Sequence, residues 1–304
     1  MVAGTQSAVT DFLTLRNGHM TVRVSPEGGT LVDGATSDGR PFLRSYEKAM
    51  RDFAVSQAAC FPLVPIGNRV AGNEFHFAGK RRVLAPNTGE RLYIHGDGWL
   101  GQWDVLEASP ATVTLAFDKR ATENSPYEYR AGQSMRLSGP RLDLGLSVEN
   151  CGNETLPFGI GFHPFFPRTP KTTLCASAIS WWTEDQSHLP QSRQQLPEAM
   201  DFASPKPIPA HWINNAFEGW DGTARIDWPE QGLSLRIEAT DIFSRFMLFA
   251  PRSDRSFFCF EPMSHTPNAL AHVETDPMGL LLLAPGEKLD GALSLTIVEG
   301  SEAQ

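Results

Sequence analysis

Cysteines are scarce in this sequence, and no two of them lie close together. The four are Cys60, Cys151, Cys175 and Cys259, and they form no C-x-x-C pair. The spacing of a zinc knuckle or of a dithiol redox motif is therefore absent. Unpaired cysteines of this kind fit a reducing, cytoplasmic setting.

An excess of positive charge is absent as well. The 26 lysines and arginines are scattered along the chain and are outnumbered by 35 acidic residues, which gives a net charge of -9. A protein that neutralises a phosphate backbone needs a concentrated basic surface. We therefore expect no nucleic acid partner.

Long hydrophobic runs are also missing. The most apolar late stretch, 280–284, is far shorter than the roughly 20 residues that cross a bilayer as a helix. Residues 1–10 have neither a positively charged start nor a long apolar run. We therefore expect no secretion signal, no membrane partner and a cytoplasmic location.

What the sequence does contain is strand patterning over most of its length. Apolar and polar residues alternate in four segments, which are 113–117, 142–148, 233–237 and 293–297. A period of two is typical of strands with one buried face. Only 45–54 has even a weak helical pattern, so the sequence predicts an all-β, mainly antiparallel fold.

Turn residues separate the expected strands. The Asn-Gly pair at 17–18 predicts a two-residue hairpin turn, because such turns need positive φ at both central positions. The Gly-Pro pair at 139–140 and the segment 230–232 lie between alternating arms, and proline-rich 205–209 predicts a surface loop. No repeat or linker divides the chain, so we expect residues 1–304 to form a single domain.

Two short segments carry groups suited to proton transfer. His163 lies in Gly-Phe-His-Pro-Phe-Phe at 161–166, where a proline and aromatic rings restrict the imidazole and its solvent. Glu261 follows the apolar run 257–260, which predicts a buried strand that delivers a carboxylate to a cleft. Such a glutamate either pairs with a cation or has a raised pKa that suits a base. Taken alone, each residue is also consistent with a structural role.

Two further segments place polar groups beside glycine, Gly-Asn-Arg at 67–69 and His-Gly-Asp-Gly-Trp at 95–99. Together and in this order, the four segments resemble the aldose 1-epimerase (galactose mutarotase) family over roughly residues 20–298. The resemblance is most specific around His163. It is also dense at 259–268, which reads Cys-Phe-Glu-Pro-Met-Ser-His-Thr-Pro-Asn.

This resemblance implies a large antiparallel β-sandwich of the galactose mutarotase-like supersandwich type, with a concave face that binds a monosaccharide. It implies that Glu261 takes the proton of the anomeric hydroxyl while His163 protonates the ring oxygen, so that the ring opens and recloses as the other anomer. The sequence leaves open whether His95 performs the second step in place of His163. Arg69, His95 and Asn68 are implied to bind sugar oxygens. No metal and no other cofactor is implied, and we expect a monomer or a homodimer.

One position departs from the family pattern. The family commonly has an aspartate before Asn-x-Phe, whereas this chain has Asn214 in the Asn-Asn-Ala-Phe segment. We still expect Asn214 to bind the sugar, but an amide donates as well as accepts, so the preferred sugar stays open. Asp221 could supply the missing carboxylate, although Asp-Gly is also an ordinary turn signal.

Three alternatives remain open on the sequence. A hexose-6-phosphate 1-epimerase needs a basic site, and Lys-Arg-Arg at 80–82 is the basic cluster near a site motif. Its position after the hairpin-like segment 75–79 predicts a solvated turn, which favours a neutral sugar. His95, His163 and Glu261 match the donor types of a two-histidine, one-carboxylate metal site. A carbohydrate-binding or sensor domain without turnover would keep the same fold.

Overall fold

The computed structural model describes residues 11–299. This range consists of strands and seven short 3-10 helices and contains no α-helix. The predicted all-β, antiparallel class is therefore confirmed. No helix within the same range is long and apolar enough to cross a bilayer. Residues 1–10, on which the expectation about a secretion signal depends, lie outside the described residues.

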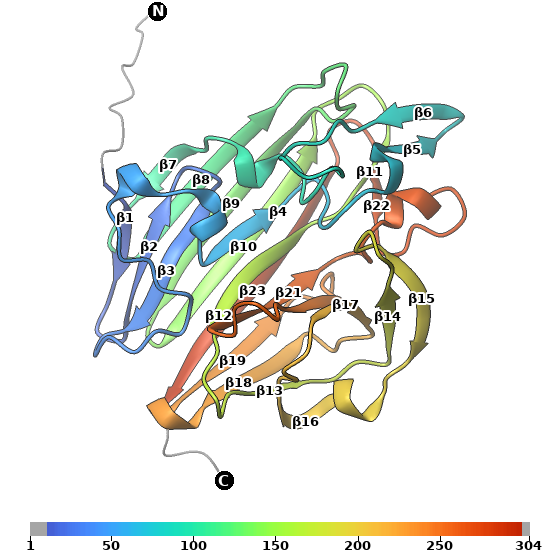
Figure 1. Ribbon diagram of the computed structural model, residues 1–304. Helices are drawn as coiled ribbons and strands as arrows, with labels where there is room; N and C mark the ends of the chain where they lie inside the picture. The colour runs from blue at the N-terminus through green and yellow to red at the C-terminus, as the bar shows by residue number, and fades with distance from the viewer. Residues whose placement is uncertain (1–10, 300–304) are drawn as a thin grey trace, which may run out of the picture.

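Two large antiparallel sheets pack against each other (Figure 1). The ten-stranded sheet contains, in spatial order, β1 (Leu13–Arg16), β2 (Met20–Ser25), β3 (Thr30–Thr36), β4 (Cys60–Leu63), β12 (Gly161–Pro167), β21 (Phe257–Met263), β20 (Arg245–Ala250), β17 (Ile213–Glu218), β14 (Ser180–Glu184) and β15 (Pro190–Gln195). The nine-stranded sheet contains β16 (Phe202–Pro207), β13 (Thr173–Ala176), β18 (Thr223–Trp228), β19 (Leu233–Ala239), β23 (Lys288–Glu299), β10 (Arg141–Asn150), β9 (Tyr129–Ser138), β8 (Thr112–Lys119) and β7 (Asp104–Ala108).

Two small two-stranded ribbons and seven 3-10 helices accompany the two large sheets in the described residues. Two ribbons pair β11 (Leu156–Phe158) with β22 (Leu281–Leu283) and β5 (Glu74–Phe77) with β6 (Lys80–Val83). The 3-10 helices are η1 (Met50–Asp52), η2 (Val55–Gln57), η3 (Ala71–Asn73), η4 (Gly98–Leu100), η5 (Glu198–Met200), η6 (Pro229–Gln231) and η7 (Ala269–His272).

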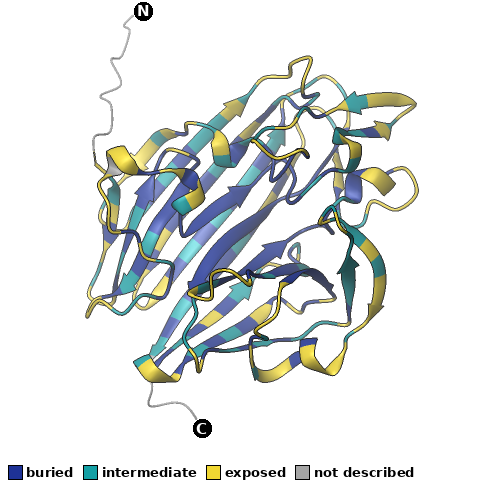
Figure 2. Ribbon diagram, viewed as in Figure 1, coloured by how far each residue is buried: buried dark blue, intermediate teal, exposed yellow. Residues whose placement is uncertain are grey.

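The hydrophobic core fills the space between the sheets. The four segments with strict alternation become β8, β10, β19 and β23, all in the nine-stranded sheet. On β10, Leu142, Leu144 and Leu146 are at most 1% exposed, while the residues between them are half-buried. Figure 2 shows the same concentration of buried residues in the central strands and of exposed residues in the loops. A one-residue shift of register would therefore expose this core face.

The central strands of the ten-stranded sheet are buried on both faces. Every residue of β4 and β17 is buried, as is nearly every residue of β12 and β21. On β21, Phe258 and Phe260 belong to the core between the sheets, whereas Cys259 belongs to a second cluster on the opposite face. The apolar run 257–260 is thus confirmed as a buried strand. Strand alternation places Glu261 on the same face as Cys259.

The turns confirm the predicted hairpins but correct one of their details. β1 and β2 are joined by three residues, 17–19, and neither Asn17 nor Gly18 has a positive φ. Instead, the Asn17 side-chain oxygen accepts hydrogen bonds from the backbone N–H groups of His19 (2.8 Å) and Met20 (3.0 Å). The predicted two-residue turn is wrong because this side chain satisfies the loop donors in a different conformation.

Three other expectations about local structure need correction. The segment 45–54 is irregular apart from η1, so the weak helical pattern did not signal an α-helix. Most of proline-rich 205–209 belongs to β16 rather than to a loop; β16 is an edge strand, where prolines that cannot donate are tolerated. Residues 80–82 form part of β6, not a solvated turn.

Candidate active site

A cavity of about 730 Å³ opens on the face of the ten-stranded sheet that points away from the core. Its floor comes from β4, β12, β21, β20 and β17, whose residues on this face alternate with the core residues. Its walls come from loops that cross this face. The cavity lining includes all the site residues predicted from the sequence, which are Glu261, His163, Arg69, His95, Asn68 and Asn214.

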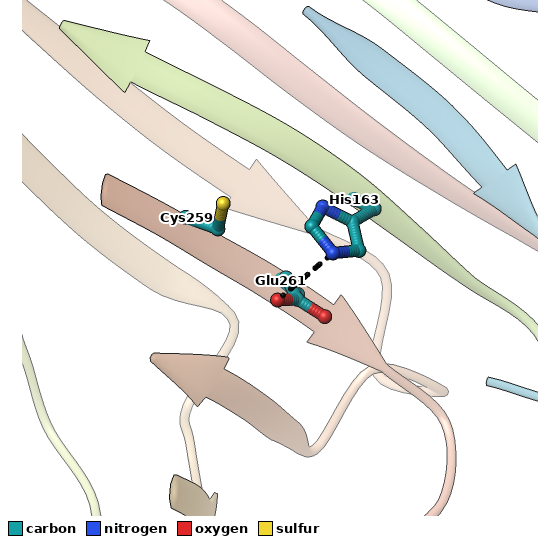
Figure 3. A group of neighbouring side chains, drawn as sticks. All are labelled: His163, Cys259 and Glu261. Carbon is teal, nitrogen blue, oxygen red and sulfur yellow. Dashed lines mark ion pairs between the residues drawn. The ribbon is translucent and has the colours of Figure 1, made fainter. Parts of the chain in front are cut away.

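Glu261 and His163 face each other on neighbouring strands of the floor. The antiparallel register of β12 and β21 sets them across from one another, and His163 Nε2 lies 3.3 Å from Glu261 Oε1 (Figure 3). Glu261 is 2% exposed and His163 is 7% exposed. The two groups therefore form a nearly dry acid–base pair at the base of an open cavity.

Aromatic rings enclose the imidazole of His163. The ring of Phe61 stacks on the imidazole with 4.4 Å between the ring centroids. The ring of Phe165 also stacks on the imidazole, with 4.7 Å between the centroids. Burial lowers the pKa of His163 to about 3. Burial also raises the pKa of Glu261 to about 8, although the charge of Arg69 opposes that rise.

The directions of the two pKa shifts, down for His163 and up for Glu261, determine where a titratable proton of the pair resides. Both shifts favour the uncharged form of each group, so near neutral pH the pair in the empty cavity holds one titratable proton, on Glu261. The other carboxylate oxygen, Oε2, and the other imidazole nitrogen, Nδ1, are buried and make no hydrogen bond. Both groups therefore have unused hydrogen-bonding capacity, which is uncommon for buried polar atoms.

His95 is held in one tautomer by the loop that carries Asn68. The backbone N–H of Asn68 donates to His95 Nδ1 at 3.2 Å, so the proton of this neutral imidazole lies on Nε2. Burial lowers the pKa of His95 well below its usual value, which keeps the ring neutral. Gly96, at φ +76°, allows this loop to pass Val64, because a Cβ there would lie 2.0 Å from the Val64 carbonyl oxygen. His95 is thus a preorganised neutral donor.

Arg69 supplies a positive charge at the cavity wall. Among the described residues that line the cavity it is the single lysine or arginine. Its Nη2 lies 2.9 Å from Glu90 Oε2, and its side chain is 16% exposed. The backbone N–H of Arg69 donates to the Asn68 side-chain oxygen at 2.8 Å, which couples the two residues of the Asn-Arg pair.

Another part of the wall contains a hydrogen-bonded group around Glu184, at the end of β14. Asn214 Nδ2 donates to Glu184 Oε1 at 3.1 Å, and Trp212 Nε1 donates to Glu184 Oε2 at 2.8 Å. The His188 imidazole also contacts Glu184 Oε1. The three residues that contact Glu184 all line the cavity, so this one carboxylate fixes the positions of three wall residues.

Comparison with known proteins identifies the family. The family model for aldose 1-epimerase matches residues 11–296. The chain belongs to the aldose 1-epimerase family. It is 39% identical over 292 residues to the uncharacterized protein YphB of Escherichia coli K12, covering 93% of this chain and 98% of YphB.

Solved structures agree with this assignment. A provisionally assigned aldose 1-epimerase of E. coli K12 matches with a TM-score of 0.88 at 38% identity, covering 95% of this chain and 99% of that one. A galactose mutarotase-like protein of Clostridium acetobutylicum matches with a TM-score of 0.82 at 20% identity, over 94% of each chain. The predicted galactose mutarotase-like sandwich is therefore confirmed.

Several further side chains of this aldose 1-epimerase family member line the cavity or support its wall, although no feature of the sequence singles them out. They are Phe61, Glu90, Glu184, His188, Trp212 and Phe249, of which Glu184 contacts three lining residues from behind and the others line the cavity. No local motif marks these residues, because strand pairing and loop packing bring them together from distant parts of the chain.

Other residues near the motifs have structural positions. Trp103 is 1% exposed within the core, whereas Trp99 lines the cavity. His265 accepts a hydrogen bond from the Gly67 N–H at 3.1 Å and so supports the Asn-Arg loop from below. The Asp221 side chain accepts from the N–H and hydroxyl of Thr223, at 2.9 and 2.8 Å, in the turn before β18. Asp221 thus does not supply the carboxylate that Asn214 lacks.

The potential metal ligands that lie closest together differ from the two-histidine, one-carboxylate set considered from the sequence. His163, Cys259 and Glu261 have ligand atoms within 4.8 Å of one another in the described chain (Figure 3). The charge of Arg69 acts on Glu261, and the charge of Arg44 acts on His163 and Cys259. Two nearby guanidinium groups disfavour a divalent cation here, so the geometry favours proton transfer.

The basic cluster at 80–82 lies away from the cavity. Lys80 and Arg82 both pair with Glu154, the latter at 2.7 Å, and Arg81 pairs with Glu74. None of these three cations is among the described residues that line the cavity. The cluster therefore offers no phosphate clamp at this site.

Burial of Glu261 leads to a prediction about stability. Its pKa rises from an ordinary value near 4.5 to about 8 in the folded chain, so the folded state keeps a proton that the unfolded state loses as pH rises between these values. Glu261→Gln removes this penalty. We expect its melting temperature to exceed that of the wild type by several degrees at pH 9 and by much less at pH 5. Thermal denaturation at both pH values measures this, and an equal difference at both would contradict the raised pKa.

Proposed function

We propose that this aldose 1-epimerase family member is a mutarotase that interconverts the α and β anomers of a free aldose. The observation that carries the proposal is the buried pair of Glu261 and His163, 3.3 Å apart at the floor of an open cavity. The pair holds one proton across the neutral pH range, which is the number that ring opening requires.

The reaction needs one base and one acid. The proton of the pair moves to His163 as Glu261 accepts the proton of the anomeric hydroxyl, and His163 gives its proton to the ring oxygen. The bond between the anomeric carbon and the ring oxygen then breaks, leaving an open-chain aldehyde. Rotation about the bond between C1 and C2 and the reverse proton transfers close the ring on the other face. Each positioned group typically contributes about 10²- to 10⁴-fold.

Other lining residues suit an uncharged sugar. His95 presents a neutral N–H donor and Arg69 a planar charged donor, and both types bind sugar oxygens and stabilise charge that develops on them. Trp99 stacks on Phe61 with 5.0 Å between their ring centroids and lines the cavity, and an indole ring offers a flat surface to the apolar face of a pyranose. These features support binding of a neutral monosaccharide over a phosphorylated one.

Anomer exchange measured by NMR tests the proposed function. Saturation transfer between the anomeric protons of an aldose is measured with and without the protein, with glucose 6-phosphate as a comparison. Faster exchange of a free aldose supports the proposal. A kcat/KM about tenfold higher for the phosphorylated sugar would instead indicate a hexose-6-phosphate 1-epimerase. Sugar binding in calorimetry without any faster exchange would indicate a sensor domain.

Arg69→Ala should act chiefly on sugar binding. Loss of a charged hydrogen-bond donor typically costs about 1.5 to 3 kcal/mol, so we expect KM to rise by about tenfold or more while kcat changes little. Steady-state exchange rates over a range of sugar concentrations measure both constants. Arg81→Ala, in the solvent-exposed β5–β6 ribbon, is the matched control. An unchanged KM for Arg69→Ala would place Arg69 outside the sugar site.

A further inference from the structure

Glu184 lies behind the cavity wall and accepts hydrogen bonds from side chains that line it. Its side chain is 14% exposed, and its two oxygens are engaged by Asn214 Nδ2 (3.1 Å), Trp212 Nε1 (2.8 Å) and the His188 imidazole. A carboxylate has only acceptors, so it must receive N–H groups from these neighbours. Glu184 thus decides which atoms of its neighbours remain for a ligand.

The consequence is greatest for Asn214, because an amide can turn either its oxygen or its nitrogen toward a ligand. The hydrogen bond from Nδ2 to Glu184 fixes which way round the amide lies, and it leaves Oδ1, which only accepts, and the second N–H of Nδ2 for other partners. Asn214 itself is 9% exposed and lines the cavity. The amide is therefore held in one orientation, in which Oδ1 can accept a hydrogen bond as a carboxylate oxygen does, although it carries no charge.

The position of Asn214 indicates which part of a sugar it would meet. β17 is two strands away from β21 in the sheet, with β20 between them, so their backbones are roughly 10 Å apart. Asn214 lies across from Phe249, which lies across from Cys259, so Asn214 is also displaced along the sheet from Glu261. With the anomeric hydroxyl at Glu261, the group that would reach Asn214 is a different ring hydroxyl. Such a hydroxyl can donate to Oδ1.

We propose that Glu184 is a positioning residue that fixes the amide of Asn214 so that its Oδ1 accepts from a ring hydroxyl other than the anomeric one. The Glu184–Asn214 pair then selects aldoses that carry a free hydroxyl at that position and rejects their deoxy and O-methyl analogues. This inference rests on the proposed mutarotase function, because it assumes that the anomeric carbon lies at Glu261.

Reciprocal substitution tests the pair. Glu184→Ala frees the amide, so we expect KM for the best aldose to rise by about tenfold with kcat within about threefold. Glu184→Gln should cost less, because its side-chain oxygen can still accept from Asn214. Asn214→Asp alone sets two carboxylates against each other and should also raise KM by about tenfold. The double variant Glu184→Gln/Asn214→Asp should recover most of the loss, because the new amide donates to the new carboxylate.

The recovery separates positioning from a merely structural role. Glu238→Ala, on the nine-stranded sheet, is the control and should leave both constants unchanged. An unchanged KM in Glu184→Ala, or a double variant as weak as Asn214→Asp, would overturn the proposal. If the wild type accelerates no aldose, the mutarotase function fails instead. Calorimetric sugar affinities of the same variants then test the pair independently, with the same rank order expected.

Discussion

Glu261→Gln should lower kcat for anomer exchange by about 10³-fold and leave the Kd of the sugar within about threefold of the wild type. Glutamine has nearly the same shape and can still hydrogen-bond a sugar hydroxyl, but it cannot accept the hydroxyl proton. Glu261 is 2% exposed, so solvent cannot readily replace it as the base. Exchange NMR gives kcat, and calorimetry gives Kd for the same preparation.

A second buried glutamate on the same sheet provides the control for this variant. Glu218 is 9% exposed and pairs with Arg193 at 2.7 Å, outside the cavity lining. Glu218→Gln should lower the melting temperature and leave kcat unchanged, because it breaks an ion pair without touching the site. Wild-type turnover in Glu261→Gln would mean that Glu261 is not the base.

The pH dependence of turnover should show the proton that the pair shares. We expect kcat/KM to be level near neutral pH and to fall about tenfold for each pH unit above about 8. The fall of kcat/KM at high pH, in place of a rise, follows from the mechanism. Above that pH the pair loses its remaining proton, so His163 has none to give to the ring oxygen, even though Glu261 is fully ionised.

The opposite profile would have a clear meaning. A kcat/KM that rises with pH through about 8 would show that the fully deprotonated pair is active and that His163 does not supply the proton. Initial rates from pH 6 to 10, corrected for uncatalysed mutarotation at each pH, distinguish the two profiles. Melting temperatures measured over the same range show whether the folded protein persists at the alkaline end.

Much of the fold could be predicted from the sequence because strand alternation is a local signal. The alternating segments became strands of one sheet, and the apolar run before Glu261 became β21, which is buried on both faces. The errors arose where side chains or partners decide the local structure. The Asn17 side chain reshaped the first turn, and an edge position let β16 accept prolines.

The candidate site could be predicted only where motifs mark it. The motif-bearing residues around His163 and Glu261 line one cavity, as the resemblance implied. Glu184 could not be found in this way, because its importance comes from contacts with Asn214, Trp212 and His188 on other segments. The search for a compensating carboxylate near Asn214 in the sequence led to Asp221, which lies in a turn of the other sheet.

The most direct test of the central claim is polarimetry on freshly dissolved α-anomers of glucose, galactose, xylose, arabinose and fucose, with wild-type protein and with Glu261→Gln. We predict that the wild type accelerates the optical change for at least one of these sugars and that the variant loses this acceleration. If the wild type accelerates none of them, or if Glu261→Gln accelerates as well as the wild type, proton transfer by the Glu261–His163 pair is contradicted.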